Sequence, residues 1–217
     1  MKHPDFLDQL TERYPQLTPL QNDIKKAAEA LIGCYQQGRK VLICGNGGSC
    51  SDSGHIAGEL MKGFEHRRSL GDELKSRLTT IGSDRGAYLA RKLQQALPAI
   101  SLAAHNALIT AVSNDMDADL IFAQQVVGYG KAGDILIAIS TSGNSRNVID
   151  AVITAKAKGL LVIGLTGETG GQMNTFCDIL IKVPGKNTAF IQELHLPVYH
   201  TLCLMVENHF FADKHNH

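Results

Sequence analysis

The sequence predicts a three-layer α/β/α sandwich around a mostly parallel five-stranded sheet, with extra helices at both ends. Two observations support this fold class. Short, continuous apolar runs recur along the chain, as in strands that are covered on both faces. The intervals between the runs are long enough for the helical crossovers that parallel strands require. The runs are 40–45, 99–104, 134–140, 160–167 and 178–184.

The composition suits one α/β domain over residues 1–217. A chain of 217 residues can bury a sizeable core. Lys plus Arg and Asp plus Glu number 21 each, so the average field favours neither nucleic acid nor an anionic membrane as a partner. The N-terminus is acidic where a signal peptide needs an apolar run, and no segment approaches the roughly 20 apolar residues of a membrane span. The five cysteines form no Cys-x-x-Cys pair, which favours reduced thiols in a cytoplasmic protein.

Helical spacing flanks the strand region on both sides. Within residues 1–38 it predicts N-terminal helices over 4–15 and 19–37. Residues 188–212 are expected to form a C-terminal helix whose apolar stripe runs through Leu194, Val198, Leu202 and Val206. The final ADKHNH contains two histidines, but we expect a frayed terminus there and no metal site.

Residues 64–97 interrupt the alternation of strands and helices. This charged stretch is too polar to be a sixth core strand, and its second half has helical spacing through Tyr88, Leu89 and Leu93. We expect an insertion, and two forms stay open: a helical arm over the site or a mobile loop.

The first glycine-rich loop, GNGGS at 45–49, follows the first predicted strand. Its glycines permit positive φ angles and close backbone approach, which leaves N–H groups free to point at an anion. The loop matches neither the dinucleotide pattern Gly-x-Gly-x-x-Gly nor a Walker loop. No nucleotide cofactor is therefore expected.

A second loop, STSGNS at 140–145, follows the third predicted strand and leads into a helix that begins near Asn144. Gly143 lets the backbone turn, and the positive end of the helix favours an anion. Such a neutral cradle suits a small phosphate monoester, although an ordinary N-capped helix would use the same residue types. Its hydroxyl donors are Ser140, Thr141, Ser142 and Ser145.

Two pairs of polar side chains have helical spacing. His55 and Glu59 are four residues apart in SDSGHIAGEL, so they share a helix face, either as a surface pair or as half of a site. Gln192 and His200 are about two helical turns apart and can also share a face. Together they would supply two imidazoles, a carboxylate and an amide oxygen, which suit a divalent metal such as zinc.

In order and spacing, GNGGS, HIAGEL, STSGNS, TGETGG and IQELHLPVYH resemble the sugar isomerase (SIS) domain family, and within it most closely the phosphoheptose isomerase branch. This resemblance implies the SIS fold and a homotetramer with active sites between subunits. It also implies one divalent metal, zinc, per subunit. The implied reaction interconverts sedoheptulose 7-phosphate and D-glycero-D-manno-heptose 7-phosphate through an enediol.

The resemblance also assigns roles to residues. It makes Glu59 the base and His200 the acid, although a bound metal would give Glu59 a competing role as a ligand. The implied metal ligands are His55, Glu59, Gln192 and His200. The implied substrate and phosphate positions are Asn46, Gly47, Ser49, Asn114, Asp115, Ser140, Thr141, Ser142, Ser145 and Gln192.

This chain departs from the family pattern at two positions. Gly63 stands where the family has an arginine, with Arg67 and Arg68 as the nearest substitutes, and Ala189 stands where it has an aspartate. The sugar phosphate is therefore open, and another phosphosugar is an alternative substrate. A second alternative is a non-catalytic SIS protein, either a phosphosugar sensor or the adaptor of the replication initiator. That adaptor lacks the helix glutamate and the final histidine, which are present here as Glu59 and His200.

Overall fold

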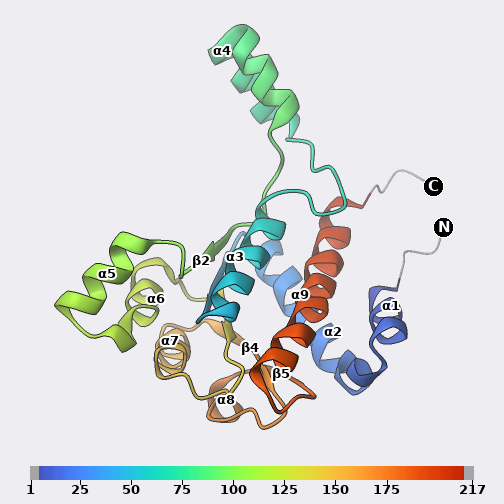
Figure 1. Cartoon of the computed structure of the whole chain (residues 1–217). Coiled ribbons are helices and arrows are strands. Elements are labelled where there is room, and N and C mark those ends of the chain that lie inside the picture. Colours follow the sequence, from blue (N-terminus) through green and yellow to red (C-terminus); the bar gives the residue numbers. More distant parts are fainter. Residues whose placement is uncertain (1–4, 213–217) are drawn as a thin grey trace.

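The computed structural model describes residues 5–212 and shows a sheet of five parallel strands between two layers of helices (Figure 1). The predicted fold class is confirmed, and every strand falls inside its predicted run. The sheet order is β2-β1-β3-β4-β5, and each neighbouring pair is parallel. The strands are β1 (Val41–Gly45), β2 (Ala99–Ser101), β3 (Ile135–Ile139), β4 (Leu161–Gly167) and β5 (Ile179–Val183).

Helices occupy the segments between the strands and both flanks. The N-terminal region contains two α-helices joined by a short 3-10 helix, which contains Pro15 and Pro19. The histidine tail 213–217 lies outside the described range. The helices are α1 (Phe6–Arg13), η1 (Pro15–Leu20), α2 (Gln21–Gln36), α3 (Gly48–Met61), α4 (Asp72–Lys92), α5 (Asn106–Asp115), η2 (Ala118–Leu120), α6 (Ala123–Tyr129), α7 (Arg146–Ala157), α8 (Met173–Phe176) and α9 (Thr188–Phe211).

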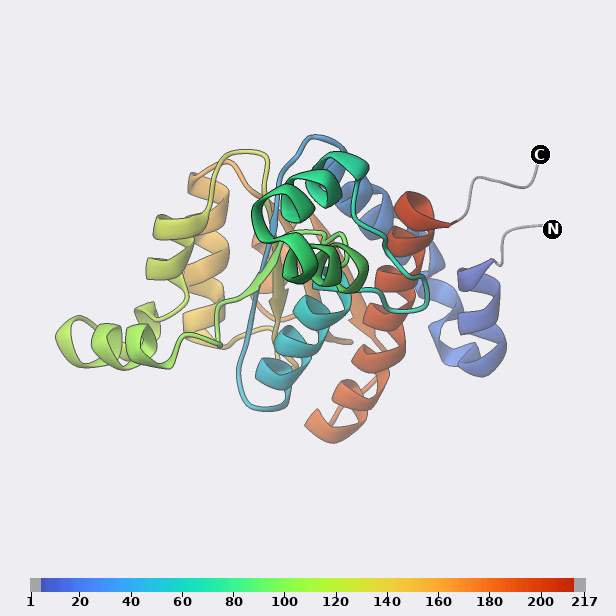
Figure 2. The same ribbon diagram turned by 90° about the horizontal axis from the view of Figure 1, so that it is seen from above.

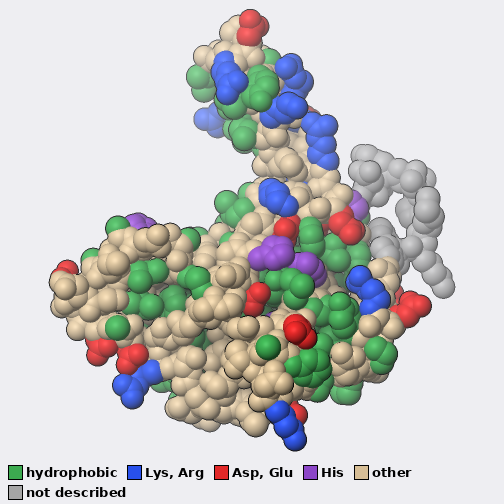
Figure 3. Space-filling view, in the orientation of Figure 1, with side chains coloured by type: hydrophobic (Ala, Val, Ile, Leu, Met, Phe, Trp, Pro, Cys, Tyr) green, Lys and Arg blue, Asp and Glu red, His purple; other side chains and the backbone are tan. Residues whose placement is uncertain are grey.

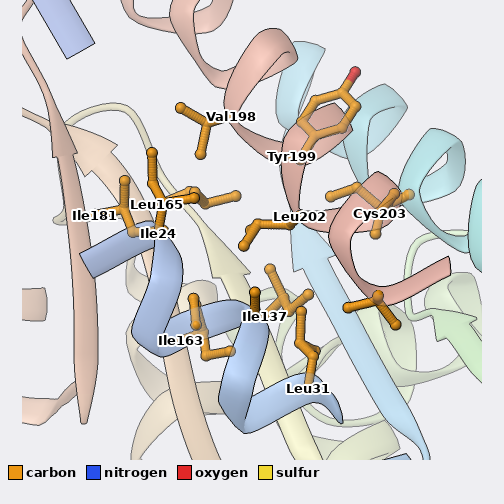
Figure 4. Close-up of a cluster of buried hydrophobic side chains, with 14 of the residues drawn as sticks. Ile24, Leu31, Ile137, Ile163, Leu165, Ile181, Val198, Tyr199, Leu202 and Cys203 are labelled. Carbon is orange, nitrogen blue, oxygen red and sulfur yellow. The ribbon is translucent and has the colours of Figure 1, made fainter. Parts of the chain in front are cut away.

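The core forms two apolar layers, one on each face of the sheet. Ile43 belongs to the layer that packs under α2, α3 and α9, and its neighbours Leu42 and Cys44 belong to the layer under α6 and α7. This alternation follows from the period of two in a strand, and both layers need apolar residues because both faces are covered. Figure 4 shows the first layer, where Ile24 and Leu202 from helices meet Ile137 from the sheet.

The sheet has one topological switch point, between β1 and β3. From β1 the sheet runs to β2 on one side, and on the other side to β3 and then outward to β4 and β5. In open parallel sheets ligands bind beyond the carboxyl ends of the strands at such a point. The two loops that leave it are the ones that follow Gly45 and Ile139, so the fold places both predicted phosphate loops side by side.

The segment 64–97 forms a helical arm that projects from the body of the molecule (Figure 1), and Figure 2 looks down onto its two helical halves. Both of its halves are helical. The chain folds back at Ser83, whose φ is 46°, and the two halves pass so closely that a Cβ on Gly86 would lie 1.9 Å from the Leu78 carbonyl oxygen. A single antiparallel bridge between Ser69 and Gln94 closes the base of the arm.

The structure also describes the state of the cysteines and the apolar length of the helices. All five cysteines are free thiols. Within residues 5–212, no helix is both long enough and apolar enough to cross a membrane.

Candidate functional site

The first glycine-rich loop turns sharply from β1 into α3. Gly47 has a φ of 57°, a conformation that favours glycine. A Cβ on Gly45 would lie 2.7 Å from the carbonyl oxygen of Ser49, so the first turn of α3 folds tightly onto the end of β1. Ser49, at this helix start, is only 3% exposed. The glycines therefore bring the positive end of α3 to the switch point.

The second loop, after β3, is held by its own hydroxyl groups and by the TGETGG segment. Ser140 Oγ lies 3.0 Å from Ser145 Oγ, and the Gly143 N–H donates to the Ser140 carbonyl at 3.0 Å. Gly143 has a φ of 67° and leaves no room for a Cβ, which would lie 2.1 Å from the Gly170 carbonyl oxygen. TGETGG thus supports the hydroxyl loop from behind.

A cavity of about 250 Å³ lies between the two loops, and we call it the phosphate cradle. Three helices direct their N-termini at it: α3, α7 with N-cap Ser145, and α9 with N-cap Asn187. Free N–H groups and aligned dipoles make such ends binding sites for anions. Its lining contains no lysine or arginine. The lining residues are Asn46, Gly47, Gly48, Ser49, Ile139, Ser140, Thr141, Ser145, Thr188 and Gln192.

Two side chains close the cradle. Gln192 reaches it from α9, and its amide passes so near α3 that a Cβ on Gly48 would lie 2.5 Å from Gln192 Nε2. Asn46 is exposed and exchanges two hydrogen bonds with Asn147 on α7, at 2.8 and 3.0 Å. The sequence pointed to Asn46 and Gln192. Asn147 was missed, because nothing in its local pattern distinguishes it from other helix residues.

A second group of polar residues lies further along α3 and α9. His55, Glu59 and His200 form what we call the acid–base cluster. His55 Nε2 is 3.3 Å from Glu59 Oε1, and the rings of His55 and His200 meet edge to face with centroids 5.0 Å apart. The other carboxylate oxygen, Glu59 Oε2, is 2.7 Å from Lys62 Nζ. Histidine side chains gather on the face of the molecule below α4 (Figure 3).

Tyr199 and Asp52 orient the His55 ring. The Tyr199 hydroxyl donates to Asp52 Oδ1 at 3.2 Å and lies 3.0 Å from His55 Nδ1. A phenol has one proton, so Tyr199 accepts the hydrogen bond from His55 Nδ1–H. This leaves His55 Nε2 as the nitrogen that faces Glu59. Both residues were missed from the sequence, although Asp52 precedes His55 by nearly one turn and Tyr199 adjoins His200.

His200 is held in its neutral form. Burial lowers the pKa of His200 from its usual value, and the nearby His55 lowers it further, against the opposite effect of Glu59. His200 Nε2 is buried and has no hydrogen-bond partner. An orphaned buried nitrogen is costly, and a ligand or substrate group at this position would satisfy it.

Some predicted residues lie apart from these two groups. Asn114 and Asp115 are exposed at the end of α5, where they hydrogen-bond to each other at 2.8 Å, and they do not line the cradle. Arg67 Nη2 donates to the Arg91 carbonyl at the base of the arm. Arg68 is buried against Glu207. Neither arginine therefore replaces the family arginine.

Close packing explains why a glycine stands at position 63. A Cβ at this position would lie 2.3 Å from the His66 carbonyl oxygen, so a larger residue would require the backbone to move. Ala189, the other departure from the family pattern, is exposed in the first turn of α9.

Over residues 5–212, no three or more His, Cys, Asp and Glu side chains form a group that could hold a metal ion. The chemistry of the acid–base cluster nevertheless suits a divalent metal. Two imidazoles and a carboxylate are zinc ligands. The contact of Tyr199 with His55 Nδ1 resembles the outer-shell contact that orients a metal-binding histidine. His200 Nε2, which has no hydrogen-bond partner, could bind a metal through its lone pair.

A layered parallel sheet with a candidate anion site at its switch point defines an open, doubly wound α/β fold, and comparison with known proteins gives its family. The SIS domain family matches residues 5–92 and 84–167, and the chain belongs to this family. The two matched segments overlap over residues 84–92, in the second half of α4.

Within the family, the chain is similar to phosphoheptose isomerases. It is 40% identical to the phosphoheptose isomerase of Synechocystis over 191 residues, which cover 88% of this chain and 85% of that protein. Two solved structures are also similar. The phosphoheptose isomerase from Francisella tularensis has a TM-score of 0.72 and 33% identity, covering 93% of this chain and 92% of its own. The enzyme from Neisseria gonorrhoeae has a TM-score of 0.69 and 33% identity, covering 92% and 91%.

Proposed function

We propose that this protein is an enzyme, an aldose-ketose isomerase that interconverts sedoheptulose 7-phosphate and D-glycero-D-manno-heptose 7-phosphate. The observation that carries the proposal is the arrangement of two sites along the same two helices. The phosphate cradle lies at the N-termini of α3 and α9, and the acid–base cluster lies further along both helices. One sugar phosphate can therefore occupy both sites. Similarity to phosphoheptose isomerases over most of the chain supports this choice of substrate.

The spacing of the two sites suits a sugar chain of this length. Ser49 lines the cradle and His55 belongs to the cluster, six residues later in α3, so they are separated by about 9 Å along the helix axis. In an extended heptose 7-phosphate, a comparable length separates the phosphate from the carbons that react. A phosphate in the cradle would therefore place C1 and C2 beside the cluster.

The reaction moves a proton between C1 and C2 through an enediol, which requires a base and an acid. In this proposal Glu59 removes the proton, and its carboxylate is kept in place by His55 and Lys62. His200 serves as the acid, since a neutral imidazole can donate its N–H to the oxygen on which charge develops. The cradle hydroxyls bind the phosphate and thereby hold C1 and C2 of the sugar beside the acid–base cluster.

We also propose a divalent metal, zinc, with His55, Glu59, Gln192 and His200 as its ligands. A bound zinc would polarise the sugar carbonyl. Gln192 lines the cradle, so the full ligand set would join the two sites. If Glu59 binds the metal, the proton must be moved by another group, and this choice is part of the test below.

The assembly and location are proposals as well. We propose a homotetramer with its sites between subunits. Exposed apolar side chains on the helices that carry the site, Met61 on α3 and Phe190 and Leu196 on α9, support an interface there. Five free thiols support a cytoplasmic location. Sedimentation at several concentrations tests the assembly, and a monomer throughout would reject it.

The activity is tested by incubating the purified protein with sedoheptulose 7-phosphate and a panel of five- to seven-carbon ketose phosphates in deuterium oxide, and following exchange at C1 and C2 by NMR. Exchange with sedoheptulose 7-phosphate is expected. Exchange only with another ketose phosphate would change the substrate. Exchange with none of them would reject the isomerase in favour of a non-catalytic phosphosugar-binding protein.

Two further measurements test whether Glu59 and a metal take part in the reaction. Glu59→Gln should abolish exchange while phosphate-ester binding persists, because the cradle is built from other residues. If a chelator also abolishes exchange and zinc restores it, the metal participates. Activity that survives in Glu59→Gln would remove Glu59 as the base.

A further inference from the structure

A buried ion pair lies behind the acid–base cluster, at the base of the arm. The side chains of Arg68 and Glu207 are fully buried, and Arg68 Nη2 is 2.9 Å from Glu207 Oε1. Arg68 Nε donates to the same oxygen at 2.9 Å. A buried ion pair is weak evidence for a stabilising role, because desolvation of two charges opposes their attraction. The groups that the two side chains hold are therefore more informative than the pair itself.

Arg68 holds the C-terminal end of α3. Its Nη1 and Nη2 donate to the carbonyl oxygens of Leu60 and Glu59, at 2.5 and 2.9 Å. The helix ends at Met61, so both carbonyls belong to the last turn, where intrahelical partners are missing. A guanidinium there also complements the negative end of the helix dipole. Because one of these carbonyls belongs to Glu59, the contact fixes the backbone from which the Glu59 carboxylate extends.

Glu207 holds the segment that follows α3. Its carboxylate accepts the backbone N–H groups of Phe64 and Glu65, both at 2.7 Å, and that of His66 at 3.3 Å. Burial by itself raises the pKa of Glu207, but the N–H groups of Glu65 and Phe64 together with Arg68 outweigh it and hold the pKa below its usual value. The carboxylate is therefore ionised at neutral pH and can act as a multiple acceptor.

Through Phe64, this contact reaches the second member of the cluster. The ring of Phe64 packs against the ring of His200, with centroids 5.3 Å apart. The backbone N–H of Phe64 is one of the groups that Glu207 binds, so the position of the ring depends on Glu207. One buried pair therefore contacts the supports of both Glu59 and His200.

We infer that Arg68 and Glu207 are positioning residues for the proton transfer: Arg68 places Glu59 through the end of α3, and Glu207 places His200 through Phe64. The inference rests on the proposed function, because it takes Glu59 and His200 as the groups that move the proton. Acid and base must be held within a fraction of an ångström of the reacting carbons, and a small displacement of either lowers the rate strongly.

The competing explanation is that the pair only anchors the arm. A second buried carboxylate provides a matched control. Asp134 is 1% exposed, pairs with Lys40 Nζ, and accepts the backbone N–H groups of Lys40 and Lys131 at 3.1 and 2.8 Å. It precedes β3, so it lies at the amino edge of the sheet, whereas the proposed site lies at the carboxyl edge. Removal of its charge should weaken the fold without reaching the cluster.

The experiment compares Glu207→Gln with Asp134→Asn. Thermal unfolding by circular dichroism first identifies a temperature at which both variants are folded, and kcat and KM for sedoheptulose 7-phosphate are then measured there. Both variants should unfold at lower temperature than the wild type. Glu207→Gln should lower kcat about tenfold to a hundredfold with KM within about twofold, since the cradle is intact. Asp134→Asn should keep kcat within about twofold of the wild type.

A folded Glu207→Gln protein with wild-type kcat would overturn the inference, as would an equal loss of kcat in Asp134→Asn. If Glu207→Gln does not fold, Arg68→Lys replaces it in the comparison, and the same loss of kcat is expected. A lysine keeps the charge but gives up the paired contacts to the two carbonyls. Phe64→Leu leaves the ion pair intact and should lower kcat through His200 alone. A wild-type protein that isomerises no sugar phosphate would instead refute the proposed function, and the inference with it.

Discussion

The phenolic oxygen of Tyr199 lies 3.0 Å from Nδ1 of His55, although the two residues are 144 positions apart. The contact joins α9 to α3 at the acid–base cluster, and it turns His55 Nε2 towards Glu59. Outer contacts of this kind set the tautomer and orientation of a functional histidine.

Replacement of Tyr199 by phenylalanine should lower isomerase activity without unfolding the protein. The ring is buried and would keep its packing, but His55 would lose the acceptor for its Nδ1 proton, and Asp52 would lose a donor. We expect a loss of about tenfold to a hundredfold in kcat or in metal affinity. Steady-state kinetics and zinc competition with a chromophoric chelator measure the two quantities.

The matched control is Tyr35→Phe. Tyr35 is also buried, and its hydroxyl donates to the Pro98 carbonyl at 3.4 Å, near the amino end of β2 and away from the cluster. Its kcat should equal that of the wild type. A Tyr199→Phe protein with unchanged kcat and zinc affinity would show that His55 needs no such contact.

Two glycines of α3 provide a test of the phosphate cradle. A methyl group at Gly48 would lie 2.5 Å from Gln192 Nε2 and would push the amide out of the cradle, whereas one at Gly54 meets nothing within 4 Å. Gly48→Ala should therefore raise KM for the sugar phosphate, and it should also lower kcat if Gln192 is a ligand of the proposed metal. Gly54→Ala should leave both constants unchanged and raise stability by about 0.5–1 kcal/mol, because alanine favours a helix interior.

Isothermal titration with inorganic phosphate separates binding from turnover in these variants. We expect weaker phosphate binding in Gly48→Ala and wild-type binding in Gly54→Ala. Equal phosphate affinity in the two variants would contradict the role of Gln192 in the cradle.

The features that the sequence predicts well are local ones. Continuous apolar runs identify all five strands, and the chemistry of the loops after β1 and β3 identifies the cradle, because each signal lies within a few neighbouring residues. His55 and Glu59 are recognisable for the same reason, since helix geometry fixes their spacing.

The features that the sequence does not predict depend on contacts between distant segments. Tyr199 reaches His55 and Asp52 only because α9 packs beside α3. For Arg68, the sequence suggests a contact that the structure does not show. Its position suggests a substrate contact, but the base of the arm turns it inward to Glu207, which is 139 residues away along the chain. Neither arrangement has a local pattern.

The arm offers a test of backbone strain. Ser83 is the one non-glycine residue with positive φ in the range 5–212, at φ 46° and ψ −124°, where the two halves of α4 fold back on each other. Such a conformation costs of order 1–3 kcal/mol. Ser83→Gly should relieve it and slow the local opening of the arm, measured as slower amide hydrogen exchange over 72–92.

The opposite change is Gly86→Ala, which would place a Cβ 1.9 Å from the Leu78 carbonyl and should force the two halves apart. Faster exchange over 72–92 is expected for this variant, with unchanged exchange in β1 and β3. Slower or unchanged exchange in Gly86→Ala would contradict the close packing of the hairpin.

His195 should make stability depend on pH. It is fully buried, and neither ring nitrogen has a hydrogen-bond partner of normal geometry, although the Thr166 backbone is near enough to raise its pKa slightly. Burial is the larger effect and lowers the pKa of His195 from 6.5 to about 4. In the unfolded chain the imidazole binds a proton below about pH 6.5, whereas the folded state binds one only below about pH 4.

The unfolded state therefore binds more protons over this window, and stability rises with pH across it. The contribution of His195 is fully present above about pH 6.5 and is lost by about pH 4, a change of roughly 3 kcal/mol. Urea unfolding at a series of pH values measures it. His195→Leu should flatten this part of the profile, while His209→Gln, a change at an exposed histidine, should preserve it. A His195→Leu profile as steep as that of the wild type would assign the pH dependence to other groups.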